Sequence, residues 1–183
     1  MLPLKPNQGG FFRPFGTTWF IIEYLKGNGP EESGKIDPFI GASMTDIHAE
    51  YKDALHRAYA RDTVEHEEEK RIGRGKSAYN EEEYNGRLEY YLNRIPYKFF
   101  RMRYPSFTKY FDHLKRLGWV KKTGFTEPST IQESYPQAPP RVYYHLTESG
   151  WKATAAEISD PLMTLYHYSR QQRSAKRNSY YRA

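Results

Sequence analysis

The sequence predicts a mainly α-helical protein with a small β-hairpin, which is an α+β fold. Phe107, Phe111 and Leu114 recur at i, i+4 and i+7, the spacing that gathers apolar side chains on one face of a helix. Residues 142–146 instead alternate, as expected for a strand with one buried face. The chain has 183 residues, among them 17 Tyr, 10 Phe and 3 Trp, so a single domain can bury a core without disulfide bonds.

The first residues are rich in Pro and Gly, and 1–16 is expected to form an irregular N-terminal arm that packs on the body through its three Phe residues. Residues 17–26 are apolar nearly all round and predict a short buried helix, capped by Thr17 or Thr18. Gly and Pro residues end this helix, and 30–43 is expected to be a loop.

A long charged helix is predicted to begin at Met44, with Ser43 or Thr45 as its cap. Its first half carries an apolar stripe that can face a core. The remainder, as far as Glu69, is polar all round, and the Gly-containing segment 71–79 breaks the helix.

Asn80 predicts the start of another helix, 80–95, because its side chain can cap the free amides and three Glu residues follow in the first turn. Pro96 ends this helix. The next residues, 97–103, are basic and aromatic and lead into the helix marked by the phenylalanine stripe.

This helix is expected to span 106–117, with Ser106 as its N-cap and Gly118 in the left-handed conformation at its end. A hairpin is predicted over 119–146. Its loop, 123–140, is rich in Pro and nearly uncharged, so the loop need not contact phosphate.

Two helices are predicted after the hairpin. Thr147 opens the first of them, 148–158. Asp160 and the Pro that follows it suit the cap and first position of a C-terminal helix, 159–174. The last residues, 175–183, are expected to be a basic, disordered tail.

Helix, strand, loop, strand and helix follow one another from 104 to 153, and this order resembles the second half of a winged-helix domain, most closely in the PadR-like and MarR-like regulators. Their pattern is roughly T-L-x-x-x-L-x-x-L-x-x-x-G-L-[IV] and then R-x-Y-Y-x-L-T-x-x-G. It is met here by Ser106, Phe107, Phe111, Leu114, Gly118, Trp119, Val120, Arg141, Tyr143, Tyr144, Leu146, Thr147 and Gly150.

The resemblance implies a winged helix-turn-helix domain over 17–158, with 106–117 as the recognition helix and the 119–146 hairpin as the wing. The chain before this recognition helix is longer than in compact members of the family. Residues 36–79 are therefore expected to be a helical insertion. In the resembled family, a helix after the wing commonly carries dimer contacts, which implies a homodimer through the C-terminal helix. The alternative is that this helix packs back on the first helix.

The basic residues are unevenly distributed. The net charge is +6 and the isoelectric point is about 9.3. Residues 97–123 contain eight basic residues and one acid, residues 169–183 contain five basic residues and no acid, and acids outnumber basic residues in 44–84. This clustering favours contact with a polyanion, and the alternative is a solvated basic surface without a partner.

The resemblance implies that the recognition helix enters the major groove of double-stranded DNA with its N-terminal half. Lys109 could then reach guanine or phosphate, and Thr108 a thymine methyl group. Asp112 is expected to accept from a cytosine amine or to pair with Lys109 or Arg116. The residues expected to contact DNA are Arg101, Arg103, Ser106, Thr108, Lys109, His113, Arg116, Lys121, Lys122 and Arg141.

These observations favour a DNA-binding protein, expected to regulate transcription. The alternative is a winged-helix module that binds RNA or serves a ribonucleoprotein or protein complex. Tyrosines interleave with basic residues near 97–110 and at 143–144, as in a stacking platform for single strands or RNA. Core packing is the favoured interpretation, with Tyr144 buried and Tyr143 on the other face of the strand.

The sequence does not indicate an enzyme, and no cofactor or metal is expected. The Gly-Lys-Ser run at 75–77 imitates the end of a phosphate-binding loop, but Lys70 stands where that motif needs Gly. His48, Asp53 and His56 could share part of a helix face. A solvated face is the favoured interpretation, because further metal ligands are lacking at close spacing.

The sequence also lacks Cys, a long apolar run and the pattern of a signal peptide. No membrane partner is therefore expected. The expected location is cytoplasmic, in association with the nucleoid if the source is bacterial or archaeal.

Overall fold

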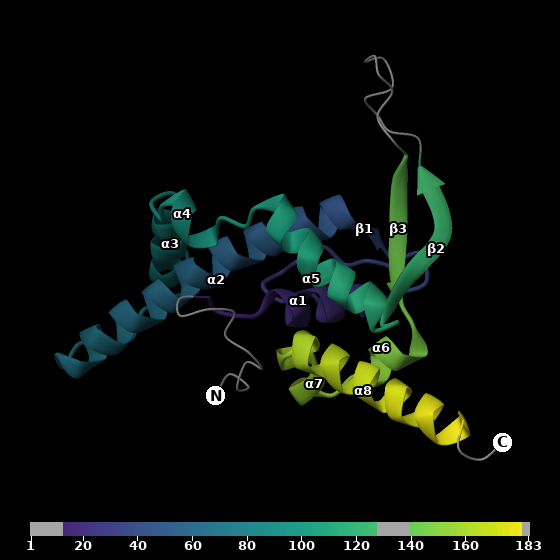
Figure 1. Cartoon of the computed structure of the whole chain (residues 1–183). Coiled ribbons are helices and arrows are strands. Elements are labelled where there is room, and N and C mark those ends of the chain that lie inside the picture. Colours follow the sequence, from purple (N-terminus) through teal and green to yellow (C-terminus); the bar gives the residue numbers. More distant parts are fainter. Residues whose placement is uncertain (1–12, 128–139, 181–183) are drawn as a thin grey trace.

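The computed structural model describes residues 13–127 and 140–180 and places them in a mixed α/β fold (Figure 1). Helices dominate, and three short strands form an antiparallel sheet in the order β1-β3-β2. The expected α+β class is confirmed at this level. Of the N-terminal arm expected over 1–16, only 13–16 lies within the described residues.

The first helix, α1 (Thr17–Leu25), lies in the centre of the protein and is almost entirely buried, as its sequence predicts. Its cap differs from the expected one. Gly16 is the N-cap, and no side chain within the described residues caps the helix. The Thr17 hydroxyl instead donates to the buried Tyr51 hydroxyl at 3.0 Å.

The long helix α2 (Met44–Gly73) begins at the predicted residue, and the Ser43 side chain caps it by accepting from Asp46 N. Its first half packs into the core, where Tyr51 and Leu55 are fully buried. The second half leaves the body (Figure 1). The segment 36–79 is thus not wholly peripheral, because it includes both β1 and the core-forming half of α2.

The second half of α2 carries α3 (Glu81–Leu92) along its side, and α4 (Tyr97–Phe100) follows (Figure 1). Asn80 forms the expected cap, in a reciprocal pair with Glu83. No residue of α3, a fully described helix, is buried. The Arg87 guanidinium and the Tyr91 hydroxyl both donate to the Glu67 carboxylate of α2.

The helix α5 (Tyr104–Arg116) carries the phenylalanine stripe, and Phe107, Phe111 and Leu114 are fully buried as predicted. It begins two residues earlier than expected, with Arg103 as N-cap and Pro105 in the first turn. Ser106 is therefore not the cap and is exposed inside the helix.

The hairpin consists of β2 (Val120–Glu127) and β3 (Arg141–Leu146), paired in antiparallel register from Val120↔Leu146 to Glu127↔Arg141. The strands extend into part of the predicted loop, 123–140; the rest of that loop, 128–139, lies outside the described residues. The expected alternation is confirmed in β3, where Tyr144 and Leu146 are buried.

The sheet has one strand that the sequence did not predict. The strand β1 (Ala42–Ser43) lies in the segment expected to be loop and pairs with β3 at Ala42↔Tyr144 and Ser43↔Tyr143. Gly41 allows this approach. It has φ +76°, and a Cβ atom there would lie 1.9 Å from Tyr144 O.

The C-terminal region forms three helices: α6 (Glu148–Lys152), α7 (Ala155–Ser159) and α8 (Pro161–Tyr180). The single helix predicted over 148–158 is wrong, because Thr154 stops it and caps α7 together with Glu157. Asp160 caps α8 as expected, accepting from Met163 N at 3.0 Å. The helix α8 continues past 174 to Tyr180, so 175–180 is helical, and 181–183 lies outside the described residues.

The core forms where α1, the first half of α2, α5, α7 and the sheet meet. Aromatic rings connect these elements: Phe20 lies 5.2 Å from Tyr51, and Phe111 meets Tyr144 edge-on at 4.8 Å. Burial of each such side chain stabilises the fold by roughly 1.5–3 kcal/mol. The helix α5 is thus held firmly on its apolar side, which fixes what its other sides present.

Candidate nucleic-acid interface

The side of α5 opposite the core carries Lys109 and Arg116, both exposed. Asp112 lies between them. Its carboxylate pairs with Lys115 at 2.6 Å, whereas pairing with Lys109 or Arg116 was expected. Among residues 13–127 and 140–170, whose side chains the structure describes, Lys109 and Arg116 form no ion pair. Lys109 and Arg116, two helical turns apart on α5, therefore present positive charge that no carboxylate of these residues neutralises.

Thr108, which was expected to contact a base, is half-buried, and its hydroxyl is already bonded within the helix. Its hydroxyl donates to Pro105 O at 2.9 Å, a bond within the first turn of α5. The hydroxyl is therefore engaged by the backbone, although its methyl group stays available for an apolar contact.

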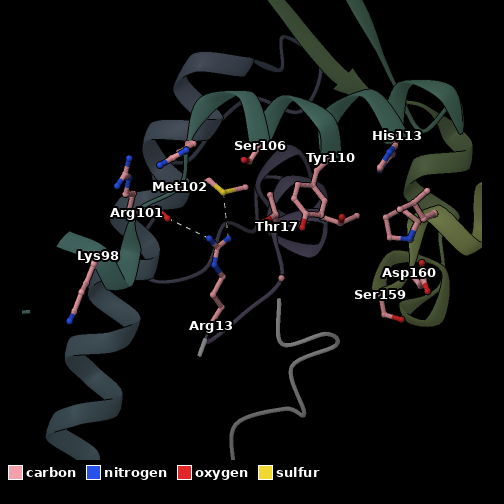
Figure 2. Close-up of a pocket in the computed structure, with 15 residues that line it drawn as sticks. Arg13, Thr17, Lys98, Arg101, Met102, Ser106, Tyr110, His113, Ser159 and Asp160 are labelled. Carbon is pink, nitrogen blue, oxygen red and sulfur yellow. Dashed lines mark hydrogen bonds between the residues drawn. The ribbon is translucent and has the colours of Figure 1, made fainter. Parts of the chain in front are cut away.

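Ser106 and His113 occupy a different side of α5, which borders a cavity of about 720 Å³, called the flank cavity below. Figure 2 shows Ser106, Tyr110 and His113 descending from α5 toward it. Arg101 and Arg103, just before the helix, line the same space. Four of the ten predicted residues thus gather around this cavity and not on the side of Lys109.

The hairpin supplies the remaining three predicted residues. Lys121 and Lys122 are exposed on β2, and Lys121 faces His145 in the strand register. Burial, and then the charge of Lys121, lower the pKa of His145. Arg141 is engaged elsewhere, because its guanidinium pairs with Asp46 at 3.5 Å and joins β3 to the start of α2.

The tyrosines divide into two groups. Tyr144 is in the core, as predicted, and the Tyr143 hydroxyl donates to Glu127 Oε2 at 2.8 Å. Tyr97, Tyr104 and Tyr110 are exposed large aromatic side chains near the basic residues of α4 and α5. Packing accounts for the hairpin tyrosines, whereas the other three leave ring surface in contact with solvent.

Sequence reasoning missed two cations of the flank cavity, Arg13 and Lys98. Arg13 is one of only two basic residues of the expected arm, with Lys5, and the residues it contacts lie far along the chain. Its guanidinium donates to Tyr51 Oη at 3.1 Å and to Arg101 O at 3.4 Å. Its position depends on this tertiary contact, for which the sequence gives no local signal.

The histidines weighed as metal ligands have other partners. His48 Nε2 donates to Met102 O at 2.8 Å, and the His56 ring stacks on Phe100 at 4.1 Å. In the described part of the chain, no three His, Asp or Glu side chains come together as a metal site would require.

Comparison of the chain with protein-family models, curated proteins and solved structures finds no match. None of the helices in the described ranges combines the length and apolar character needed to cross a membrane.

Proposed function

We propose that this chain is a winged-helix protein that binds double-stranded DNA and regulates transcription, with α5 as the recognition helix and the β2–β3 hairpin as the wing. One observation carries the proposal. The helix α5 buries Phe107, Phe111 and Leu114 and presents Lys109 and Arg116, without carboxylate partners in the described residues, on the opposite side. A rigidly held helix with such a face suits insertion into the major groove.

The order of elements supports the same proposal. The elements α1, β1, the first half of α2, α5, β2 and β3 follow one another, and β1 completes the sheet beside β3. In this assignment, the first half of α2 precedes the recognition helix in the helix-turn-helix. The second half of α2, with α3 and α4, is then the inserted part.

The predicted contacts differ in what they supply. Lys109 and Arg116 are placed to reach bases or phosphates, and Lys121 and Lys122 on the wing are placed to reach phosphates. Arg141 is a weaker candidate, because DNA would have to compete with Asp46 for its guanidinium.

RNA binding is the second candidate function, and exposed aromatic rings favour it. Tyr97, Tyr104 and Tyr110 present ring surface near Lys98 and Arg101. Unpaired bases can stack on such rings, whereas a duplex keeps its bases stacked internally.

We further propose a homodimer through α8. Leu162 is 60% exposed and Tyr166 is 57% exposed one turn later, next to the half-exposed Met163. A second copy of the same helix could cover this apolar surface symmetrically. Sedimentation of the wild type and of Leu162→Glu/Tyr166→Glu tests this, and a wild-type monomer at micromolar concentration would contradict it.

The test of nucleic-acid binding is fluorescence anisotropy with random duplex DNA and with structured RNA, from about 50 to about 300 mM salt. Lys109→Ala/Arg116→Ala is compared with Lys35→Ala/Arg74→Ala, which removes the same charge from exposed positions elsewhere. Loss of two phosphate contacts should lower the salt slope by about two for the first variant only. Equal slopes for the two variants would refute the assignment of α5, and a preference for RNA would favour the second candidate.

A further inference from the structure

The flank cavity is lined by four cations and one carboxylate. The carboxylate is Asp160, whose Oδ1 already caps the first turn of α8. The cations form no ion pair within the described residues and are Arg13, Lys98, Arg101 and Arg103. Like charges gathered at the wall of a concave site create a positive potential that attracts an anion.

Arg13 is held in place at this wall (Figure 2). One guanidinium nitrogen donates to Tyr51 Oη at 3.1 Å and lies 3.5 Å from the Met102 sulfur, and the other donates to Arg101 O at 3.4 Å. All three partners are uncharged groups. The side chain is half-buried, so its charge is partly desolvated but is not neutralised by these contacts.

The N-terminus of α1 opens onto the same cavity through Gly16, Thr17 and Thr18. Gly16 lacks a side chain that could cap the helix, and its first turn contains no acid. The amides of a helix N-terminus carry partial positive charge and favour an anion. This contribution adds to that of the four cations.

The side chain of His113 adds a ring to the wall of the cavity. Its Nδ1 atom is buried and, in the described part of the chain, forms no hydrogen bond. His113 lines the flank cavity together with Ser106 and Tyr110 of the same helix.

We propose that the flank cavity binds a small organic oxyanion that carries two or more negative charges as phosphate or carboxylate groups. Four cations and a helix N-terminus suit a polyvalent anion better than a monovalent one. A volume of about 720 Å³ is that of a small-molecule site. The cavity is bordered by α1 on one side and by the corner between α7 and α8 on another.

The site does not depend on the proposed DNA binding, and its test contains no DNA in the first step. Isothermal titration calorimetry of the full chain uses pyrophosphate and citrate as probes, with sodium chloride at matched ionic strength as the reference. Saturable binding of one anion per chain is expected for at least one probe. Pyrophosphate and citrate distinguish a phosphate ligand from a carboxylate ligand.

Two double variants locate the binding. Arg101→Gln/Arg103→Gln should weaken the anion at least about tenfold, because both side chains line the cavity. Lys109→Gln/Arg116→Gln removes the same charge from the other side of α5 and should change the affinity less than about twofold. Circular dichroism of both variants checks that the fold is retained.

Three results would overturn the proposal. The first is the absence of saturable binding for both probes. The second is an equal loss of affinity in the two double variants, which would indicate general charge attraction. The third is the absence of small-anion binding together with duplex binding that is lost in Arg101→Gln/Arg103→Gln, which would assign these cations to the nucleic-acid backbone.

Discussion

Gly41 is the position at which we expect a single added methyl group to disturb the sheet most directly. Its φ is +76°, and a Cβ atom there would lie 1.9 Å from Tyr144 O and 2.6 Å from Tyr144 C. The blocking atoms belong to the backbone of β3, so rotation of a side chain cannot relieve the clash. Gly41→Ala should therefore push β1 away from β3.

The magnitude follows from two contributions. A residue with a Cβ atom in the left-handed conformation costs about 1–2 kcal/mol. Separation of β1 from β3 also breaks the pairing at Ala42↔Tyr144 and Ser43↔Tyr143, at roughly 0.5–1.5 kcal/mol for each hydrogen bond lost. Together, Gly41→Ala should lower the free energy of unfolding by about 3 kcal/mol.

Gly86→Ala is the matched control, because it makes the same chemical change in the middle of α3. No described atom lies within 4 Å of the Cβ position of Gly86. Alanine is the better helix former by about 0.8–1.0 kcal/mol, so this variant should be neutral or more stable. Urea unfolding, followed by circular dichroism and by the fluorescence of the buried Trp119, measures both. The reasoning fails if Gly41→Ala unfolds within about 1 kcal/mol of the wild type, or if the two variants shift in the same direction.

Two further predictions concern the core and its dependence on pH. Phe111→Ala, which leaves a cavity beside Tyr144, should lower the free energy of unfolding in urea by about 3–5 kcal/mol. Phe125→Ala, on the exposed part of β2, should lower it by less than about 1 kcal/mol. Similar losses in the two variants would contradict the assigned burial. Burial lowers the pKa of His48 below its usual 6.5, despite the bond to Met102 O. The unfolded chain therefore binds a proton at His48 more readily than the folded chain. The stability that neutral His48 contributes is fully present above pH 6.5 and is lost as the pH falls through the lowered pKa of the folded state. Urea midpoints between pH 8 and pH 5 should fall less steeply in His48→Gln, and an unchanged slope would show that this residue is not responsible.

The helix α5 links the two proposed sites. Lys109 and Arg116 lie on the side opposite the core, and Ser106, Tyr110 and His113 repeat at i, i+4 and i+7 along the cavity side. An oxyanion bound in the cavity would contact the same helix that we propose to enter the major groove. If both proposals hold, the affinities for oxyanion and for DNA are expected to be coupled, and by the same factor in each direction.

Local signals in the sequence were enough to locate most of the helices. The caps at Asn80 and Asp160, and Ser43 as one of two candidates, were predicted from a polar side chain and the residues within one turn of it. The buried stripe of α5 and the alternation of β3 were read from spacing alone. These features depend on contacts between residues a few positions apart, so a single stretch of chain contains all the information needed.

Only the tertiary structure decided what depends on contacts between distant residues. The two-residue strand β1 has no period of its own and exists because β3 offers it a partner about 100 residues later. The ion pair of Arg141 with Asp46, 95 positions away, likewise engages the guanidinium of a predicted DNA contact. Arg13 joins the flank cavity because the folded chain brings it to Arg101, 88 positions away. The sequence by itself determined most of the helices, the hairpin and the basic character of the α5 region. Packing decided which of its charges remain unpaired and which of them surround the cavity.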